Sequence, residues 1–307
     1  MEFILTILGS GGAQPAQEKH PSAQILQVNN RFFLIDVGEG TQIQLLRYGF
    51  SHQKIDHIFI SHLHGDHYLG LMGLLFSMHL SRRQADLHLY SPPGLDEIIL
   101  LQLKHARSAL SYRICFHPVK AEENEVLFED DEIRIQSFPL NHRIPCSGFL
   151  FAEKNRQYRI IKEKLPANIL LQHIALLKQG KNVVDEQGRI LLEASEYTRP
   201  PHHARSYAYC SDTAYNPKIC SIIRHADLCY HEATFMESDF QKATETYHST
   251  AKQAGRIAKE ADVKRLLIGH ISARYKKTDE LLTEAKSEFE FTELALEGNS
   301  FHVSRSS

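Results

Sequence analysis

The chain has 307 residues, 42% of them hydrophobic, and a formal net charge of −2 at pH 7. This length and composition predict one large α/β domain or two smaller ones with a substantial buried core. The near-neutral charge gives no global attraction to nucleic acid, so a polyanionic partner would need a local basic patch.

The cysteines and the N-terminus exclude several further classes. Five cysteines are an odd number, and none forms a CxxC pair, so neither a disulfide framework nor a cysteine zinc knuckle is indicated. The N-terminus has no basic segment before its short apolar run, and no stretch of about eighteen apolar residues occurs. We therefore expect a cytoplasmic protein that does not span a membrane.

Short strand-like runs alternate with helical ones along most of the chain. Strands are expected in FILTILG and in RFFLIDV, and a short helix in TQIQLLRYGF. A strand in KIDHIFISH is followed by a helical pattern from Tyr68 to about Leu80. Further strands are expected in LHLYS, EIRIQSFP, SYAYC, DLCYHE and RLLIG. This alternation predicts an α/β fold.

Residues 152–201 differ from the rest, because no strand there ends in histidine or aspartate. Between Ala152 and Asn182 this segment has a local excess of positive charge, from Lys154, Arg156, Arg159, Lys162, Lys164, Lys178 and Lys181. Such a run is typical either of a solvated insertion or of a surface that contacts a polyanion.

The segment SHLHGDH gathers three imidazoles and a carboxylate directly after an apolar run. Residues two apart in an extended segment point to the same side, so His62 and His64 can converge on one point. A turn at Gly65 lets Asp66 and His67 reach a second point nearby. Imidazole and carboxylate ligands together suit zinc, with manganese or iron as alternatives, and two ions fit better than one.

Further ligands are expected at the ends of other strands on the same edge. FPLNH offers His142, YCSD offers Asp212 and LLIGH offers His270. Asp212 is the only carboxylate among these three, so it is the candidate to bridge two ions with its two oxygens.

Motifs along nearly the whole chain resemble those of the metallo-β-lactamase superfamily and, within it, the ribonuclease Z family of endonucleases that remove the 3′ trailer from precursor tRNA. They are LGSGGAQP, DVGEGTQIQLL, SHLHGDHYLGLMGLL, FEDD, LNHRIPCSGF, YCSDT, HEATF, YHSTAKQAG and GHISARY. The resemblance implies a single metallo-β-lactamase domain over residues 1–307, folded as an αβ/βα sandwich. It also implies two Zn²⁺ ions per subunit at one edge.

The resemblance also implies roles for individual residues. The first metal would be held by His62, His64 and His142, the second by Asp66, His67 and His270, with Asp212 bridging. Asp66 would accept a proton from the attacking water, and His248 would protonate the leaving 3′ oxygen. His248 also suits a capping turn, since Ser249 or Thr250 could cap the next helix. His231 and Glu232 would orient His248 or a ligand histidine, or would be satisfied polar residues at a strand end.

Residues 152–201 occupy the place of the family's flexible arm, which grips the tRNA. The seven basic residues above would then contact the substrate, and a homodimer is implied. Two alternatives remain: a dimetal hydrolase of small esters, and a binding module without activity. The complete ligand set argues against the binding module, and the basic arm argues against the small-ester hydrolase.

Overall fold

The computed structural model describes residues 2–13, 19–154 and 157–304. These described residues fall into two compact units, the first made of those up to residue 152 and from 205 to 304, and the second of those between 153 and 204. Within the described residues, no helix is both long and apolar enough to cross a membrane.

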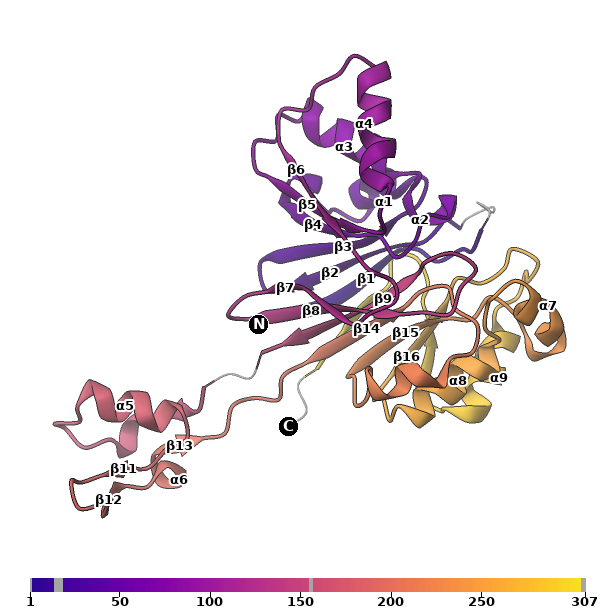
Figure 1. Ribbon diagram of the computed structural model, residues 1–307. Helices are drawn as coiled ribbons and strands as arrows, with labels where there is room; N and C mark the ends of the chain where they lie inside the picture. The colour runs from indigo at the N-terminus through magenta and orange to yellow at the C-terminus, as the bar shows by residue number, and fades with distance from the viewer. Residues whose placement is uncertain (1, 14–18, 155–156, 305–307) are drawn as a thin grey trace. The chain divides into compact units, whose positions relative to one another are not determined.

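The first unit is built on two seven-stranded sheets (Figure 1). The first sheet contains, in spatial order, β18 (Ser300–His302), β1 (Phe3–Gly9), β2 (Ala23–Val28), β3 (Arg31–Val37), β4 (Ile55–Phe59), β5 (Leu87–Ser91) and β6 (Ile114–Pro118). The second contains β17 (Thr292–Leu294), β16 (Leu266–Gly269), β15 (Leu228–Glu232), β14 (Ser206–Cys210), β9 (Ser147–Glu153), β8 (Ile133–Pro139) and β7 (Glu125–Glu129).

Helices cover the outer face of each sheet, which gives four layers. The first sheet carries α1 (Thr41–Arg47), α2 (Gly65–Tyr68), α3 (Leu71–Leu80) and α4 (Leu95–His105). The second carries α8 (Ala251–Glu260) and α9 (Asp279–Glu288), and the short α7 (Phe240–Glu245) lies in the connection between β15 and α8. Short 3₁₀ turns lie at His52–Lys54, Pro217–Ser221 and Glu237–Asp239. These layers are the αβ/βα sandwich that the sequence predicts.

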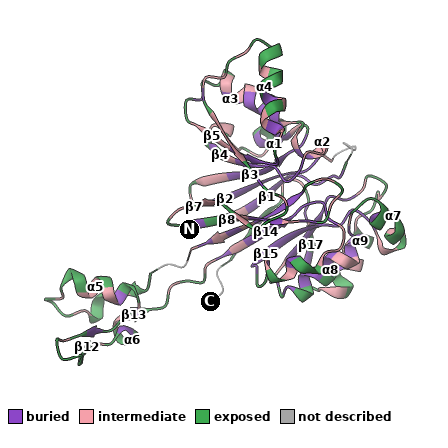
Figure 2. Cartoon of the chain, viewed as in Figure 1, coloured by how far each residue is buried: buried purple, intermediate pink, exposed green. Residues whose placement is uncertain are grey.

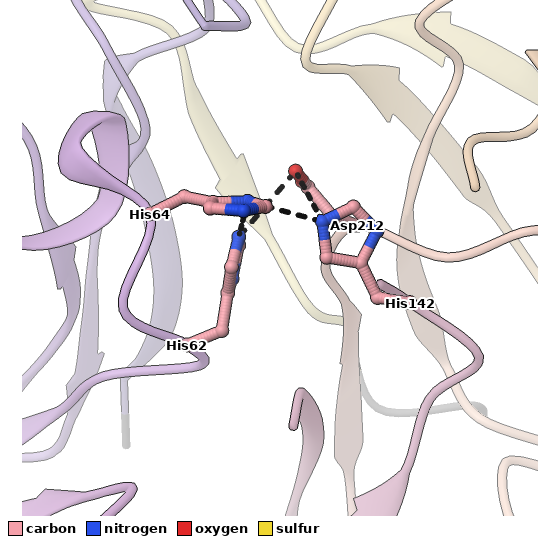
Figure 3. Close-up of side chains that lie close together, drawn as sticks. All are labelled: His62, His64, His142 and Asp212. Carbon is pink, nitrogen blue, oxygen red and sulfur yellow. Dashed lines mark hydrogen bonds and ion pairs between the residues drawn. The ribbon is translucent and has the colours of Figure 1, made fainter. Parts of the chain in front are cut away.

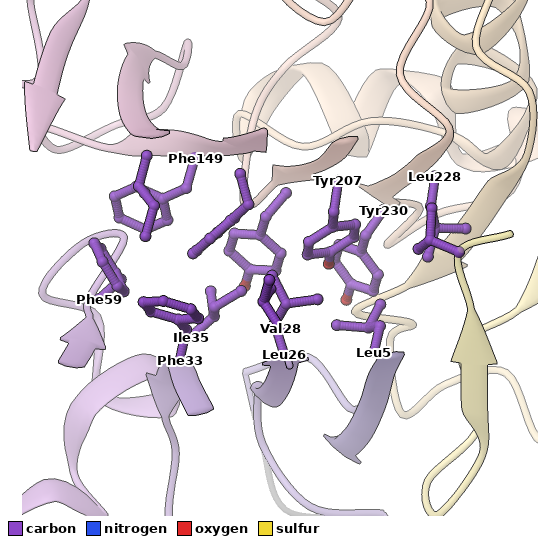
Figure 4. Packing of buried hydrophobic residues seen from close by; sticks show 14 of the residues in the cluster. Leu5, Leu26, Val28, Phe33, Ile35, Phe59, Phe149, Tyr207, Leu228 and Tyr230 are labelled. Carbon is purple, nitrogen blue, oxygen red and sulfur yellow. The ribbon is translucent and has the colours of Figure 1, made fainter. Parts of the chain in front are cut away.

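A shared apolar core lies between the two sheets (Figure 4). Phe33 and Phe59 of the first sheet meet Phe149 and Tyr207 of the second, and each is at most 1% exposed. Burying one such side chain contributes roughly 1.5–3 kcal/mol, so this layer holds the sheets together and fixes their edges relative to one another.

Strand direction gathers the ends of several strands at one edge. β3, β4, β5 and β6 run parallel to one another, as do β14, β15, β16 and β17. The loops after these strands therefore lie at the carboxyl edge of their sheet, where polar side chains are free of ladder pairing. The Ser147 amide donates to the Ser61 carbonyl across the two sheets at 3.0 Å.

The helical pattern expected from Tyr68 begins earlier and is interrupted. α2 covers Gly65–Tyr68, and α3 begins only at Leu71. At the break, the Gly70 amide donates to the Val37 carbonyl at 2.9 Å. A Cβ atom at Gly70 would lie 2.1 Å from the Gly38 carbonyl oxygen, so glycine alone lets the chain pass this close to the end of β3.

The second unit has its own small core of Leu177, Val183 and Ala194. Its elements are β10 (Arg159–Ile160), a 3₁₀ turn (Lys162–Lys164), α5 (Leu171–Lys178), β11 (Val183–Val184), β12 (Ile190–Leu192), α6 (Ala194–Tyr197) and β13 (Thr198–Arg199). β10 pairs with β13, and β11 with β12, both antiparallel. Most of the described residues of this unit are exposed (Figure 2).

Candidate metal centre

The loop after β4 places four of the predicted site residues. His64 is extended, with φ −73° and ψ 145°, and α2 begins at Gly65. His62 and His67 are fully buried at 0% exposure. The extended stretch and the helical turn that follows direct the His62 and His64 rings to one point, and the Asp66 and His67 side chains to another.

His62, His64, His142 and Asp212 form the first cluster (Figure 3). His64 Nδ1 lies 3.1 Å from both His62 Nε2 and His142 Nε2. Asp212 Oδ2 lies 3.6 Å from His62 Nε2 and 3.9 Å from His142 Nε2. Atoms bound to a tetrahedral zinc ion lie roughly 3.3–3.6 Å apart, so this cluster has suitable dimensions for one.

Asp66, His67, Asp212 and His270 form the second cluster. Asp66 Oδ2 lies 3.3 Å from His67 Nε2 and 3.1 Å from His270 Nε2. Asp212 Oδ1 lies 3.4 Å and 3.3 Å from the same two nitrogens. Because Asp212 offers Oδ2 to one cluster and Oδ1 to the other, its carboxylate joins the two.

The buried carboxylates and the unpartnered ligand atoms of the centre are suited to binding cations. His67 Nε2 and Asp212 Oδ1 are buried without a hydrogen-bond partner in the described structure. Burial by itself would lower the pKa of His67, but the carboxylates of Asp212, Asp36 and Asp66 raise it well above its usual value. Such a concentration of buried carboxylates requires compensating positive charge, which metal ions provide.

Asp36, at the end of β3, has a part in the site that the sequence reasoning missed. It accepts hydrogen bonds from His67 Nδ1 at 2.8 Å, the Ser61 amide at 2.7 Å and the Tyr209 hydroxyl at 2.6 Å. The bond from His67 fixes the tautomer that leaves Nε2 free for a metal. An aspartate directly after the buried residues Leu34 and Ile35 was the available signal.

Backbone and hydroxyl groups orient two other rings. His142 Nδ1 donates to the Tyr247 carbonyl at 2.9 Å, and His270 Nδ1 lies 2.9 Å from Thr234 Oγ1. Asp36, Tyr247 and His270 adopt left-handed backbone conformations, with φ of 54°, 58° and 55°. Non-glycine residues adopt this region rarely, and they concentrate at functional sites.

His248 lies beside the second cluster and is held by Glu232. Its Nδ1 donates to Glu232 Oε1 at 2.9 Å, and its ring stacks on that of His270 with centroids 5.5 Å apart. Burial would lower the pKa of His248, but the Glu232 carboxylate raises it to about 9. The raised pKa favours the protonated ring of His248, in which Nε2 carries a proton.

The residue that caps the helix after His248 is Thr250, and not Ser249. Thr250 is the N-cap of α8 and forms a capping box with Gln253. Ser249 instead donates from Oγ to the Thr213 carbonyl at 2.7 Å, and its amide donates to Glu232 Oε1 at 3.0 Å. The capping turn and the His248–Glu232 contact therefore coexist.

Glu232 and His231 behave differently although they are adjacent. Glu232 is fully buried and also accepts from the Thr213 and Thr234 amides, both at 3.0 Å. His231 contacts the Glu232 carbonyl oxygen through Nδ1, and its Nε2 has no partner in the described residues. The orienting contact with His248 thus comes from Glu232, and no hydrogen bond links His231 to a cluster histidine.

The basic residues expected to bind substrate all belong to the second unit or its border. The structure exposes Arg159, Lys162, Lys164, Lys178 and Lys181, and leaves Lys154 partly buried. Arg156 lies outside the described residues. The exposed side chains are accessible to a polyanion, and their role in binding stays a prediction.

The fold and the paired His/Asp clusters define a metallo-β-lactamase-fold hydrolase of the dimetal type. Chain-wide similarity identifies the family. The chain is 47% identical over 304 residues to ribonuclease Z of Cytophaga hutchinsonii, covering 99% of this chain and 97% of that one. It is 43% identical over 297 residues to ribonuclease Z of Bacteroides fragilis, covering 96% and 97%. The chain therefore belongs to the ribonuclease Z family.

Solved structures agree with this fold, and a family model matches part of the chain. Human tRNase Z, short form, superposes with a TM-score of 0.72 at 26% identity, covering 98% of this chain and 99% of that one. The metallo-β-lactamase fold protein YhfI from Bacillus subtilis superposes with a TM-score of 0.69 at 20% identity, covering 98% and 100%, and supports the fold alone. Residues 3–160 also match the family model described as anti-Pycsar protein Apyc1.

Proposed function

We propose that this protein removes the 3′ trailer from precursor tRNA by two-metal phosphodiester hydrolysis at the paired clusters. The observation that carries the proposal is the Asp212 carboxylate, whose two oxygens belong to two clusters. The chain's membership of the ribonuclease Z family suggests the substrate class.

The proposed cofactors are two Zn²⁺ ions per subunit, with manganese or iron as alternatives. The first would be held by His62, His64 and His142 and the second by Asp66, His67 and His270, with Asp212 shared. When bound, such ions supply the positive charge that makes water a better nucleophile and stabilises charge on the phosphate.

Asp66 and His248 are the proposed proton-transfer residues. Burial would raise the pKa of the Asp66 carboxyl, but the His67 charge and the His270 hydrogen bond lower it, so the carboxyl is ionised. In this proposal the carboxylate accepts a proton from the attacking water. The water oxygen forms a bond to phosphorus, and the bond from phosphorus to the 3′ oxygen breaks. His248 donates its Nε2 proton to that oxygen, and Glu232 holds the ring in place.

The second unit is the proposed tRNA-binding arm, inserted at residues 152–201 into a single catalytic domain that spans 1–307. Its basic residues Lys154, Arg156, Arg159, Lys162, Lys164, Lys178 and Lys181 would contact phosphates away from the cut. A homodimer is also proposed, as the family resemblance implies. A cytoplasmic location is proposed as well, since all five cysteines are free thiols.

Hydrolysis of small phosphate esters is the alternative, because the clusters by themselves define only a metallohydrolase. A gel assay distinguishes the two. The protein is incubated with a precursor tRNA carrying a 3′ trailer, and with the same RNA denatured so that its tertiary fold is lost. Cleavage at the end of the acceptor stem in the folded RNA only is expected. Equal, weak cleavage of both RNAs beside rapid hydrolysis of a small diester would favour the alternative.

A further inference from the structure

Two cavities flank the metal centre within the first unit. One, of about 360 Å³, is lined by residues that include Ala13, Phe235, Lys242, His248, His270 and Arg274. The other, of about 440 Å³, is lined by residues that include Leu63, Pro92, Val119, Ala121, Ile144 and Pro145. We call the first the His248 pocket and the second the Leu63 pocket.

Sheet order places these cavities on opposite sides of the centre. The cluster residues follow β4 of the first sheet and β8, β14 and β16 of the second. The His248 pocket uses the loops after β1, β15 and β16, toward one side edge of both sheets. The Leu63 pocket uses the loops after β5, β6 and β8, toward the other. One edge of the sandwich thus carries pocket, metal centre and pocket in a row.

The loops that carry the cluster histidines also form the Leu63 pocket. Leu63 lies between His62 and His64, so in an extended segment its side chain points to the side opposite their rings. Ile144 and Pro145 follow His142 by two and three residues. The Leu63 pocket is therefore adjacent to the first cluster without including its ligand atoms.

The position of His248 gives the direction of the RNA across this edge. His248 donates its proton to the leaving 3′ oxygen, which belongs to the nucleoside that stays on the tRNA. That nucleoside must lie on the side of the His248 pocket. The attacking water and the leaving 3′ oxygen lie roughly in line through phosphorus, and the 5′ oxygen of the trailer lies between them, to one side of that line. An extended strand whose tRNA nucleoside lies at the His248 pocket therefore carries its trailer across the metal centre, toward the opposite side. The opposite side is the Leu63 pocket.

We propose that the Leu63 pocket binds the base of the first trailer nucleotide, an inference that rests on the proposed function. Its walls are mostly aliphatic side chains and proline rings, which offer flat apolar surface to a base. Single-stranded RNA is commonly recognised through bases that are unstacked and held against apolar or aromatic side chains. Lys120 and Glu122 also line this pocket, and Lys120 Nζ lies 3.9 Å from Glu123 Oε2 in an exposed ion pair.

The test pairs a change in the pocket with a change in the RNA. Ala121→Leu and Ala121→Trp fill the pocket progressively, and Ala106→Trp, at an exposed position after α4, is the matched control. Each protein is assayed under single-turnover conditions with precursor tRNA whose first trailer nucleotide is intact or abasic. Metal content is measured for every variant.

For the unchanged protein, the abasic RNA should be cleaved roughly five- to a hundredfold more slowly, the range expected for loss of one stacked base. Ala121→Leu and Ala121→Trp should slow cleavage of intact RNA by increasing factors, with little further effect of removing the base. Ala106→Trp should behave as the unchanged protein does. Metal content should not change.

Three results would overturn the inference: equal cleavage of both RNAs by the unchanged protein, full activity of Ala121→Trp on intact RNA, or equal slowing of both RNAs by Ala121→Trp. Each is distinguishable from failure of the proposed function, in which the unchanged protein would cleave neither RNA at the tRNA end.

Discussion

At the scale of single residues, Asp212 is distinguished from the other ligand candidates because both clusters use it. Asp212→Ala should therefore reduce the affinity for both metal ions, whereas His142→Ala should mainly weaken the first. Even the loss of a residue that only supports a ligand costs roughly 10- to 100-fold in affinity, so larger losses are expected here. Metal content after dialysis against a graded series of chelator concentrations measures both. Two tightly held ions in Asp212→Ala would show that the bridging assignment is wrong.

His248 should matter to the rate and not to the metal content. Its ring is held by Glu232 beside the second cluster and packs on His270, but His248 belongs to neither of the two clusters that share Asp212. His248→Ala should slow cleavage of precursor tRNA by roughly 10²- to 10⁴-fold, the usual contribution of a general acid. His225→Ala, at an imidazole that is 61% exposed, is the control and should have no effect. A loss smaller than tenfold would count against the proton-donor role.

Some residues of the site can be predicted from the sequence and others cannot. Four of the seven ligand candidates lie close together in SHLHGDH, the other three each follow a strand, and the structure brings all seven together in two clusters. The contact from Asp36 to Tyr209 joins residues 173 positions apart, and that from Glu232 to His248 depends on a loop geometry with no local signature. Such partners follow from the packing of the two sheets, which no single segment encodes.

At the scale of elements, strands were easier to predict than the breaks between helices. Apolar runs that end in turn or ligand residues indicate buried strands, as in RLLIGH. The interruption between α2 and α3 depends instead on Gly70 passing close to Gly38, a contact between distant segments. Helical periodicity continues across such a break, because it reports only which side of the segment is buried.

Gly255 in α8 tests a second close approach between elements. Glycine to alanine usually stabilises a helix by about 1 kcal/mol. Here, however, the added Cβ would lie 2.4 Å from the Ala285 carbonyl oxygen of α9. Gly255→Ala should therefore lower stability, by about 1–3 kcal/mol as for other overpacked sites, and a thermal melt reads this directly. A rise in Tm would mean that the two helices separate easily and that their close contact is unimportant.

The arm is the element whose role is most separable from the chemistry. It has its own small core, so replacing Asn155–Thr198 with a short Gly-Ser bridge should leave the first unit folded. Affinity for precursor tRNA should fall, and the dependence of affinity on salt should flatten by roughly one unit for each lost phosphate contact. Metal content should be unaffected. Lys162→Glu with Lys164→Glu should reproduce part of the change, and Lys259→Glu, exposed on α8, serves as the control.

If the shortened protein kept normal affinity and salt dependence, the arm would be a solvated insertion. The assignment of a tRNA substrate would then depend on family membership and on the metal centre.

At the scale of the whole molecule, the layered fold explains why the ligands come from such distant parts of the chain. The core between the sheets positions two carboxyl edges side by side, and the loops of both edges supply side chains to one centre. Neither sheet carries a complete cluster, since His62 and His64 follow β4 of the first sheet, and His142 and Asp212 follow β8 and β14 of the second (Figure 3). Correct packing of the sheets is therefore a condition for metal binding.

The central claim is that two metal ions, shared through Asp212, are needed to cut precursor tRNA. The most direct measurement strips the protein of metal and follows release of the 3′ trailer as zinc is added back in known ratio to the chain. We expect little cleavage up to one ion per chain, if the two sites fill in sequence, or a curved rise if they fill together, with a plateau at two ions in either case. A plateau reached at one ion per chain, or full activity in the stripped protein, would contradict the account.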